Sequence, residues 1–516
     1  MNELLEKEKT ILEKIADIYI FIMILLFPLI VDKTGFFHIL ECKWRAYASI
    51  AGTYFLLNIF IILYFMIFKK TNIFRSNELS IIQWLAIAFL GVNILSCFTS
   101  PFFGKYNLFI GVGRGEGLIM MSFYTLSFLF VSLFAKFKRK YISYFTISSI
   151  FVSLIAILQY IGFNPFNMFQ DGIGTHNVSF MGTIGNVDFV SALYCIFLPI
   201  SFSAFIFLED NEKWEKILHL LSVLMGFFII GIIDVQSGKL AFLITLIIIF
   251  PFILLNNRRL SRFLTLLATI LMSYCINVIL NPEYHYDLNH LGLYFQFNYI
   301  VVLFLIVCSI LIYLSYVLKK IDYTCSNNQR IIKMYYLGIF GCGIFALLVL
   351  YFGNFKSGIL YEIHELLHGN FDDNFGTYRI FLWKRTLTLI PQYLLLGSGP
   401  DSFAIRFMAK YTNDIAAIGP LTINDTAANV YLTMAMNIGI IGLFTYLSFL
   451  FFQLREGIKK IRYSDFFASF VLLVAIICYL IQDFFNLSLV IVTPIFWLLM
   501  ALHYKSIFVE KRKFLD

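Results

Sequence analysis

Short polar clusters rich in glycine, asparagine and charged residues stand immediately before long apolar runs. Residues 111–117 read GVGRGEG, 183–189 TIGNVDF, 234–239 DVQSGK and 424–429 NDTAAN. A helix that starts at such a cluster offers free N–H groups and a partial positive charge, which suit a bound anion. Glycine lets backbone donors approach closely. Together with Arg114, Lys239 and Arg379, these clusters predict an outward-facing site for a diphosphate.

A purely structural interpretation is open for several of these residues. Ser237 and Asp425 are suitable helix N-caps. Arg114 and Glu116 could form a surface pair at a helix start, and the cluster around Asn186 could serve only to let a helix enter the membrane. We keep both interpretations at this stage.

Arg379 is harder to explain structurally. It opens an amphipathic stretch that ends at Pro391, and an arginine in a first helical turn opposes the helix dipole. An anionic partner would explain its position. The stretch predicts a helix on the membrane surface, with one apolar face formed by Ile380, Trp383, Leu387 and Ile390.

Other polar residues give weaker signals. His364 and His368 share a helical spacing, but two histidines are too few for a metal site, and the eight cysteines are scattered without a paired motif. We therefore expect neither a metal nor another cofactor. Secondary candidates for substrate binding are Asn186, Asn429, Ser237 and Arg45; Arg45 follows the first apolar run, where lipid headgroups are also possible partners.

The elements that must position these residues are membrane helices. The chain of 516 residues is 60% hydrophobic and 14% charged, against about 25% charged in a soluble domain, and its mean hydropathy is +0.82. Apolar runs long enough to cross a bilayer recur from end to end. The sequence predicts an all-α, polytopic transmembrane protein of about 14 spans: 15–31, 48–68, 80–99, 117–135, 141–162, 184–207, 217–233, 238–255, 263–281, 297–318, 334–352, 430–452, 466–484 and 487–504.

The basic residues predict the orientation. With a cytoplasmic N-terminus, roughly two thirds of the 39 Lys and Arg residues fall in short inner loops. We therefore interpret the net charge of +8 as topology, not as nucleic-acid binding. The domains expected are a cytoplasmic segment 1–14, membrane domain 15–352, an extracytoplasmic loop 353–429 with an amphipathic helix between spans 11 and 12, membrane domain 430–504 and a cytoplasmic tail 505–516. The protein is then a multi-pass protein of the cytoplasmic (plasma) membrane, and both of its termini lie on the cytoplasmic side.

The clusters, in this order, resemble the O-antigen ligase and O-antigen polymerase family of membrane glycosyltransferases. Residues 114–117 (RGEG) are similar to its R-x-EG element, 183–186 (TIGN) to T-x-GN, 379–384 (RIFLWK) to R-x-x-x-W-K, and 396–403 (LGSGPDSF) to LLG-x-GP-x-x-F. Residues 429–432 (NVYL) and 437–443 (NIGIIGL) are similar to HN-x-YL followed by GLLGL. The resemblance covers roughly residues 20–500.

This resemblance implies a GT-C-like, metal-independent glycosyltransferase. Such enzymes move a glycan from undecaprenyl diphosphate to an acceptor hydroxyl at the outer membrane face, in cell-surface polysaccharide assembly. Arg379 and Asp425 are then the candidate catalytic residues, and Arg114, Lys239 and Arg379 would hold the diphosphate. The partners are the lipid-linked glycan, membrane lipids and an acceptor that is a glycan, lipid, wall polymer or protein.

Two residues depart from the family pattern. Lys239 stands near the place of a family arginine, and Ala428 stands where ligases have the histidine associated with acceptor activation. An alanine cannot take a proton. Because polymerases vary more here, the departure favours a polymerase slightly over a ligase. Two alternatives stay open: a lipid-linked oligosaccharide flippase or transporter, and a catalytically degenerate scaffold of the ligase family.

Overall fold

The computed structural model describes residues 2–32, 35–68, 79–161, 163, 165, 168, 182–208, 213–280, 299–321, 328–418, 425–461 and 467–508. Within these ranges the regular structure is helical and contains no strand, which confirms the all-α prediction. Asn424 and residues 509–516 of the predicted tail lie outside the described residues.

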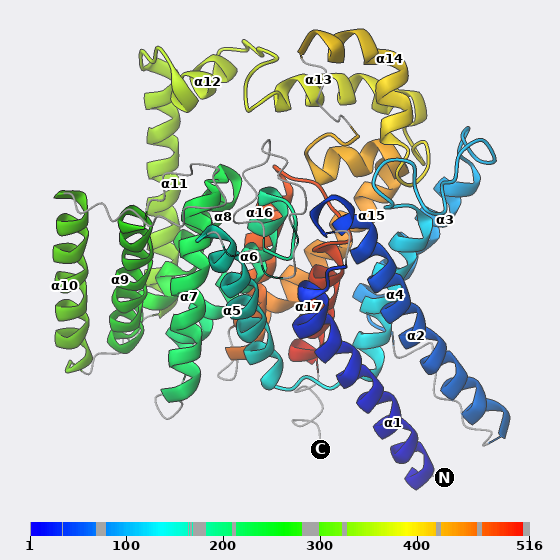
Figure 1. The fold of residues 1–516 in the computed structure, drawn as a ribbon, viewed down its shortest axis with the longest axis horizontal. Coiled ribbons are helices and arrows are strands. Elements are labelled where there is room, and N and C mark those ends of the chain that lie inside the picture. The colour runs from blue at the N-terminus through cyan, green and yellow to red at the C-terminus, as the bar shows by residue number, and fades with distance from the viewer. Residues whose placement is uncertain are drawn as a thin grey trace.

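The helices follow one another as a membrane bundle with a separate helical group at one end (Figure 1). The α-helices are α1 (Asn2–Phe21), α2 (Ile39–Phe68), α3 (Ile81–Phe98), α4 (Leu118–Phe134), α5 (Lys140–Tyr160), α6 (Val187–Phe207), α7 (Lys213–Ile233), α8 (Gln236–Leu254), α9 (Asn257–Ile279), α10 (Tyr299–Lys319), α11 (Asn328–Phe352), α12 (Gly358–Leu367), α13 (Arg379–Leu389), α14 (Phe403–Ile418), α15 (Val430–Lys460), α16 (Phe467–Asp483) and α17 (Thr493–Phe508). Short π or 3-10 helices are Ile22–Leu26, Phe27–Leu29, Gly35–His38 and Ile390–Tyr393.

Ten of the described helices are long and apolar enough to cross a membrane, and α4 and α16 are shorter apolar helices. The chain is therefore a multi-pass membrane protein. α6 lies at the centre, buried along its whole apolar window between α5, α7, α8 and α16, whereas the window of α11 has no buried residue. A helix that is apolar on every side can be buried among other helices or can face lipid.

The second span begins earlier than predicted. Helix α2 starts at Ile39 and not at residue 48. Lys43, near its start, is buried and binds carbonyl oxygens of the preceding segment. Lys43 Nζ donates to the carbonyl oxygens of Phe27 and Pro28 at 2.9 and 2.7 Å. Thr183 Oγ1 also donates to the Pro28 carbonyl, at 2.6 Å. These donors satisfy carbonyls left free where the first helix breaks.

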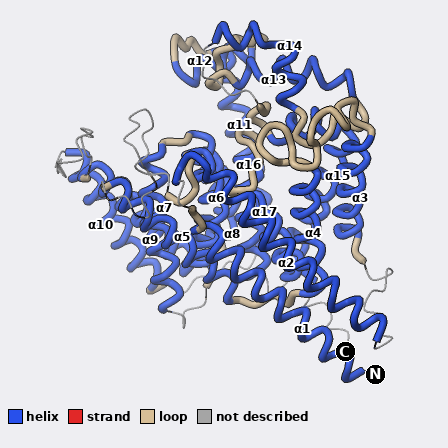
Figure 2. Tube along the Cα trace, turned by 45° about the vertical axis from the view of Figure 1, so that its right-hand side comes forward, coloured by secondary structure: helices blue, strands red, loops and turns tan. Residues whose placement is uncertain are grey.

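The predicted loop 353–429 carries α12, α13 and α14 in its described part. Figures 1 and 2 both show these helices grouped beyond one end of the bundle. Phe381, Leu382 and Leu389 of α13 are buried although they lie outside the predicted apolar face, whereas Leu387 of that face is 56% exposed. The reason is tertiary: α13 packs on α14 and α15, with Phe381 beside Phe407.

The twelfth predicted span is interrupted. Gly439 has φ +71° and ψ −178°, so α15 is two helical segments joined at a break. Ile440 and Ile441 N–H donate across to the carbonyls of Leu394 and Leu395. A Cβ at Gly439 would lie 2.2 Å from the Leu395 carbonyl oxygen, so only glycine fits. The break therefore joins the segment after α13 to the membrane domain.

Candidate functional site

An ion pair joins the loop before α4 to the segment before α15. Arg114 Nε donates to Asp425 Oδ2 at 2.6 Å, and both side chains are largely buried. The other oxygen, Asp425 Oδ1, is buried without a hydrogen-bond partner among the described residues. The two terminal nitrogens of Arg114 likewise make no hydrogen bond to the described part of the chain. A ligand could therefore use both groups at once.

The glycine-rich loop before α4 wraps around a carboxylate. Asp401 Oδ2 accepts the backbone N–H groups of Gly113 and Arg114 at 3.0 Å and those of Gly115 and Glu116 at 3.1 and 3.3 Å. A Cβ at Gly111 would lie 2.2 Å from the same oxygen. The glycines in this cluster thus serve an internal anion, Asp401, and the wrapping fixes the position of Arg114.

Burial shifts the protonation of two carboxyls beside this loop. It raises the pKa of Asp401 to about 6, against its four N–H donors, which favour the ionised form. It also raises the pKa of Glu116 to about 8, with a further increase from the nearby Asp401. The Tyr124 hydroxyl lies 3.0 Å from both Glu116 oxygens. Glu116 pairs with Tyr124 and not with Arg114, so the surface-pair interpretation is wrong.

Arg379 is oriented by neutral oxygens. Its Nη1 donates to the Gly376 carbonyl at 3.0 Å and to Thr377 Oγ1 at 2.8 Å, and its Nη2 donates to the Phe485 carbonyl at 3.1 Å. Its Nε is buried without a partner in the described structure. Thr377 and Tyr378 both have positive φ, a costly conformation for such residues. The cation is thus held in place, while no carboxylate among the described residues lies within ion-pair distance of it.

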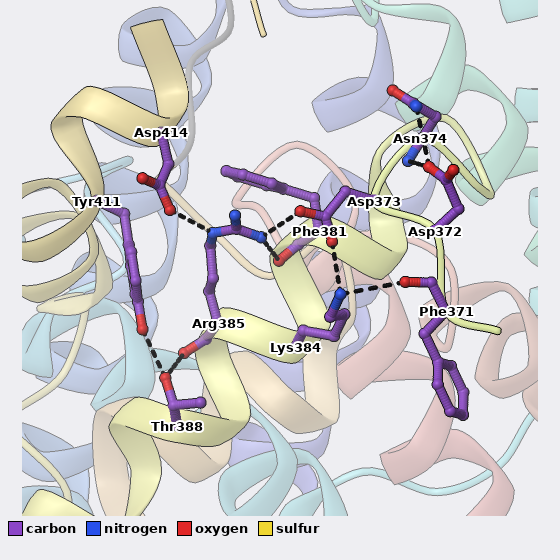
Figure 3. Close-up of polar contacts among 10 residues, drawn as sticks. All are labelled: Phe371, Asp372, Asp373, Asn374, Phe381, Lys384, Arg385, Thr388, Tyr411 and Asp414. Atoms are coloured by element: carbon purple, nitrogen blue, oxygen red, sulfur yellow. Dashed lines mark hydrogen bonds and ion pairs between the residues drawn. The ribbon is translucent and has the colours of Figure 1, made fainter. Parts of the chain in front are cut away.

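Arg385, six residues along the same helix, provides the contrast (Figure 3). Its Nε donates to Asp414 and its Nη1 to Asp373, at 2.9 and 2.8 Å. These contacts raise the pKa of Arg385 and lower that of Asp373, although burial acts against both shifts. Arg385 is therefore a neutralised structural arginine that ties α13 to its neighbours.

Asp188 brings the two candidate arginines together. It lies in the first turn of α6, and both Arg379 and Arg114 are close enough to interact with its charge. The Asp188 backbone carbonyl accepts from Asn486 Nδ2 at 3.2 Å, and Asn486 follows the Phe485 that binds Arg379. Three of the polar clusters therefore converge on one region.

A cavity of about 80 Å³ lies beside the Arg114–Asp425 pair. Its lining includes Arg114 and Glu116 from the first cluster, Asp401, and residues of α3, α4, α15, α16 and α17. Arg379 does not line this cavity. The candidate diphosphate site at Arg379 therefore lies outside the cavity.

The remaining candidate residues are placed as follows. Lys239 forms an ion pair with Asp234, and no described contact joins it to Arg114 or Arg379. Ser237 is half-buried in the first turn of α8, close to where Gly238 packs on Ser191. Arg45 is exposed and pairs with Asp32 and Glu41 at 3.4 and 3.8 Å.

Asn186 and Asn429 are helix N-caps. Asn186 Oδ1 accepts the N–H of Asp188 at 2.8 Å, and Asn429 Oδ1 accepts that of Leu432 at 3.0 Å. The N-cap interpretation of Ser237 and Asp425 is wrong, because the caps of α8 and α15 are Val235 and Asn429.

Ala428 and the histidines do not complete a site. Ala428 has φ +47°, and its neighbour Ala427 accepts the Trp383 Nε1–H at 3.0 Å. His364 and His368 each donate Nδ1–H to a main-chain carbonyl oxygen, that of Leu350 and that of His364. The described residues contain no group of three His, Cys, Asp or Glu side chains that could hold a metal ion.

Sequence reasoning missed the functional candidates that line the cavity within the helices. Asp401 stood in a recognised motif, but nothing nearby in sequence indicated a carboxylate wrapped by a loop from the other half of the chain. Asn93 and Asn437 carried a usable signal, because polar side chains inside apolar spans are costly and often functional.

Residues 288–447 match the sequence model of a protein family described as O-Antigen ligase. The matched range covers α10 to the middle of α15 and includes Arg379, Asp401 and Asp425. A search of curated proteins found no match.

Proposed function

We propose, from the membership of this chain in the O-antigen ligase family, that it transfers an undecaprenyl-diphosphate-linked glycan to an acceptor hydroxyl. The match of residues 288–447 to this family and the multi-pass helical fold support the proposal. The protein then acts as a metal-independent transferase at the outer face of the cytoplasmic membrane.

The observation that carries the proposal is the convergence of Arg114 and Arg379 on Asp188. Arg379 has no carboxylate within ion-pair distance among the described residues, and Arg114 keeps two nitrogens free of described hydrogen bonds. Arginine binds phosphate oxygens bidentately. Both therefore suit a diphosphate, and Lys239 in the first turn of α8 is a proposed further ligand.

The proposed reaction is a displacement at the anomeric carbon of the donor glycan. The acceptor oxygen forms a bond to that carbon while the bond to the diphosphate oxygen breaks. The acceptor proton passes to Asp425 Oδ1, and the lipid diphosphate leaves with its charge stabilised by Arg379 and Arg114. Positioned donors of this kind typically contribute about 10²–10³-fold each, and a base contributes about 10²–10⁴-fold. Asp425 would thus replace the histidine absent at Ala428.

The orientation proposed from the basic residues suits this chemistry. Figure 1 shows the N-terminus at the end of the bundle away from α12–α14. With that end cytoplasmic, the group formed by α12–α14 and the site beneath it face outward, where lipid-linked glycans are polymerised or ligated. The domains predicted from sequence would then keep their assigned sides.

Transfer by the purified protein tests the proposal. The protein in lipid nanodiscs is incubated with undecaprenyl-diphosphate-linked glycan from its native host, and glycan length and free undecaprenyl diphosphate are measured. Longer or transferred glycan with stoichiometric lipid release supports a transferase. In sealed vesicles, donor that stays intact but moves to the other leaflet would support a flippase. Donor that is neither consumed nor moved would support a scaffold.

A further inference from the structure

The turn that precedes α13 has a conformation that its own residues disfavour. Gly376, Thr377 and Tyr378 have φ values of +61°, +54° and +64°, so three consecutive residues are left-handed. Only the glycine adopts this conformation at little cost. Two strained residues in a row persist only where the surrounding structure holds them. The conformation of the 376–378 turn therefore depends on groups that bind it.

The turn is joined directly to Arg379. The Gly376 carbonyl oxygen accepts Arg379 Nη1–H at 3.0 Å and the Arg379 backbone N–H at 3.3 Å. Thr377 Oγ1 accepts from the same Nη1 at 2.8 Å. The direction of the guanidinium is therefore set by the positions of Gly376 and Thr377. A shift of the turn would either carry the Arg379 side chain with it or break these hydrogen bonds.

Glu362 on α12 holds the turn from another helix. Its Oε2 accepts the Gly376 N–H at 3.0 Å, and 14 positions separate the two residues in the chain. Tyr361 beside it packs edge-on against Phe375, with ring centroids 6.1 Å apart. A hydrogen bond to a carboxylate is stronger than one between neutral groups. Glu362 thus ties α12 to the backbone that orients Arg379.

Helix α12 is fixed in turn to the end of α11. His364 Nδ1–H donates to the Leu350 carbonyl oxygen at 2.8 Å, and Figure 1 shows α12 beyond that end of α11. No residue of α12 is buried, and the apolar window of α11 has no buried residue either. The two helices therefore form an outlying arm of the molecule. The bond between Glu362 and Gly376 joins this arm to Arg379.

We propose that Glu362 is a positioning residue for Arg379, holding the 376–378 turn so that the guanidinium faces the donor diphosphate. This inference rests on the proposed function, in which Arg379 holds that diphosphate. Glu362 acts through the Gly376 N–H and not on the substrate. The role requires a hydrogen-bond acceptor at position 362, and it does not require the negative charge.

Three variants separate the hydrogen bond from the charge. Glu362→Gln removes the charge but keeps an acceptor oxygen, whereas Glu362→Leu removes both. Glu365→Leu is the control on the same helix, because Glu365 accepts from Asn370 Nδ2 at 2.7 Å and no described hydrogen bond joins it to the 376–378 turn. All three variants lose one negative charge, so a general electrostatic effect on a bound anion would be similar in each. Glutamine and leucine suit a helix about as well as glutamate does.

Hydrogen–deuterium exchange of the protein in nanodiscs measures the turn without any substrate. We expect peptides that cover residues 373–380 to exchange about threefold faster or more in Glu362→Leu, because the turn loses a contact that holds it. Exchange in Glu362→Gln and Glu365→Leu should match the wild type. Thermal unfolding of the same samples confirms that each variant is folded.

Calorimetry with farnesyl diphosphate, a lipid diphosphate without a glycan, measures the effect on binding, with empty nanodiscs as the blank. We expect Glu362→Leu to raise the Kd about fivefold or more, and Glu362→Gln and Glu365→Leu to keep it within about twofold of the wild type. In an Arg379→Ala background, Glu362→Leu should change the Kd no further, because Glu362 acts through Arg379.

The positioning role and the proposed function can fail separately. Unchanged exchange or unchanged binding in Glu362→Leu, an equal loss in Glu362→Gln, or the same loss in the Arg379→Ala background would overturn the role of Glu362. Wild-type protein that does not bind farnesyl diphosphate would also overturn it, even if glycan transfer is observed. The expected pattern of binding and exchange without glycan transfer would support the role of Glu362 and contradict the transferase.

Discussion

Arg114 Nε and Asp425 Oδ2 lie 2.6 Å apart although 311 residues separate them in the chain. The contact joins two polar clusters that precede different membrane helices. The 111–117 loop wraps around Asp401 and so fixes the position of Arg114. The contact leaves one oxygen of Asp425 buried without a partner among the described residues. The account of the site depends on this arrangement.

Asp425→Asn removes the proposed base while keeping the size of the side chain. We expect kcat to fall by about 10²–10³-fold with little change in binding of the donor. The control is Asp414→Asn on α14, which breaks a pair with Arg385 and should leave kcat within about threefold. Steady-state transfer kinetics measure both. Equal kcat in Asp425→Asn and wild type would contradict the role of Asp425.

Gly439→Ala should destabilise the protein by at least about 2 kcal/mol. The added Cβ would meet the Leu395 carbonyl oxygen at 2.2 Å, and the residue would have to keep a positive φ. The control is Gly91→Ala in α3, where nothing lies within 4 Å; alanine should stabilise that helix by about 0.5–1 kcal/mol. Thermal unfolding in detergent compares the two. A Gly439→Ala protein as stable as Gly91→Ala would disprove the close contact.

Glu116 should make stability depend on pH. Its folded pKa of about 8 lies above the ordinary value of 4.5, so the folded state keeps a proton that the unfolded state has lost. The stability contributed by Glu116 is full below pH 4.5 and is lost as the pH rises to about 8. Asp401 also contributes stability at low pH, but its contribution is lost by about pH 6. Glu116→Gln should therefore flatten the fall in thermal stability between pH 6 and 8. An unchanged slope in the variant would exclude Glu116 as its source.

The apolar runs and the polar clusters before them were predictable from sequence, because span length and helix-start chemistry are local properties. The buried residues of α13 were not predictable, because Phe381, Leu382 and Leu389 are covered by tertiary packing of α13 on α14 and α15. The break at Gly439 depends on carbonyls from Leu394 and Leu395. Contacts of this kind, like that of Asp401 with the 111–117 loop, join distant segments and leave little local trace.

The central claim is that Arg379 holds the departing diphosphate, and its neighbour Arg385 provides the control. Both are arginines of α13, but only Arg385 is neutralised by carboxylates. We expect Arg385→Ala to keep the activity of the folded protein within about threefold.

Release of undecaprenyl diphosphate from the glycan-loaded donor is the most direct measurement. The account predicts release by the wild-type protein in nanodiscs, a loss of about 10²-fold or more in Arg379→Ala, and near-normal release in Arg385→Ala. Full release by Arg379→Ala, or an equal loss in both variants, would contradict it.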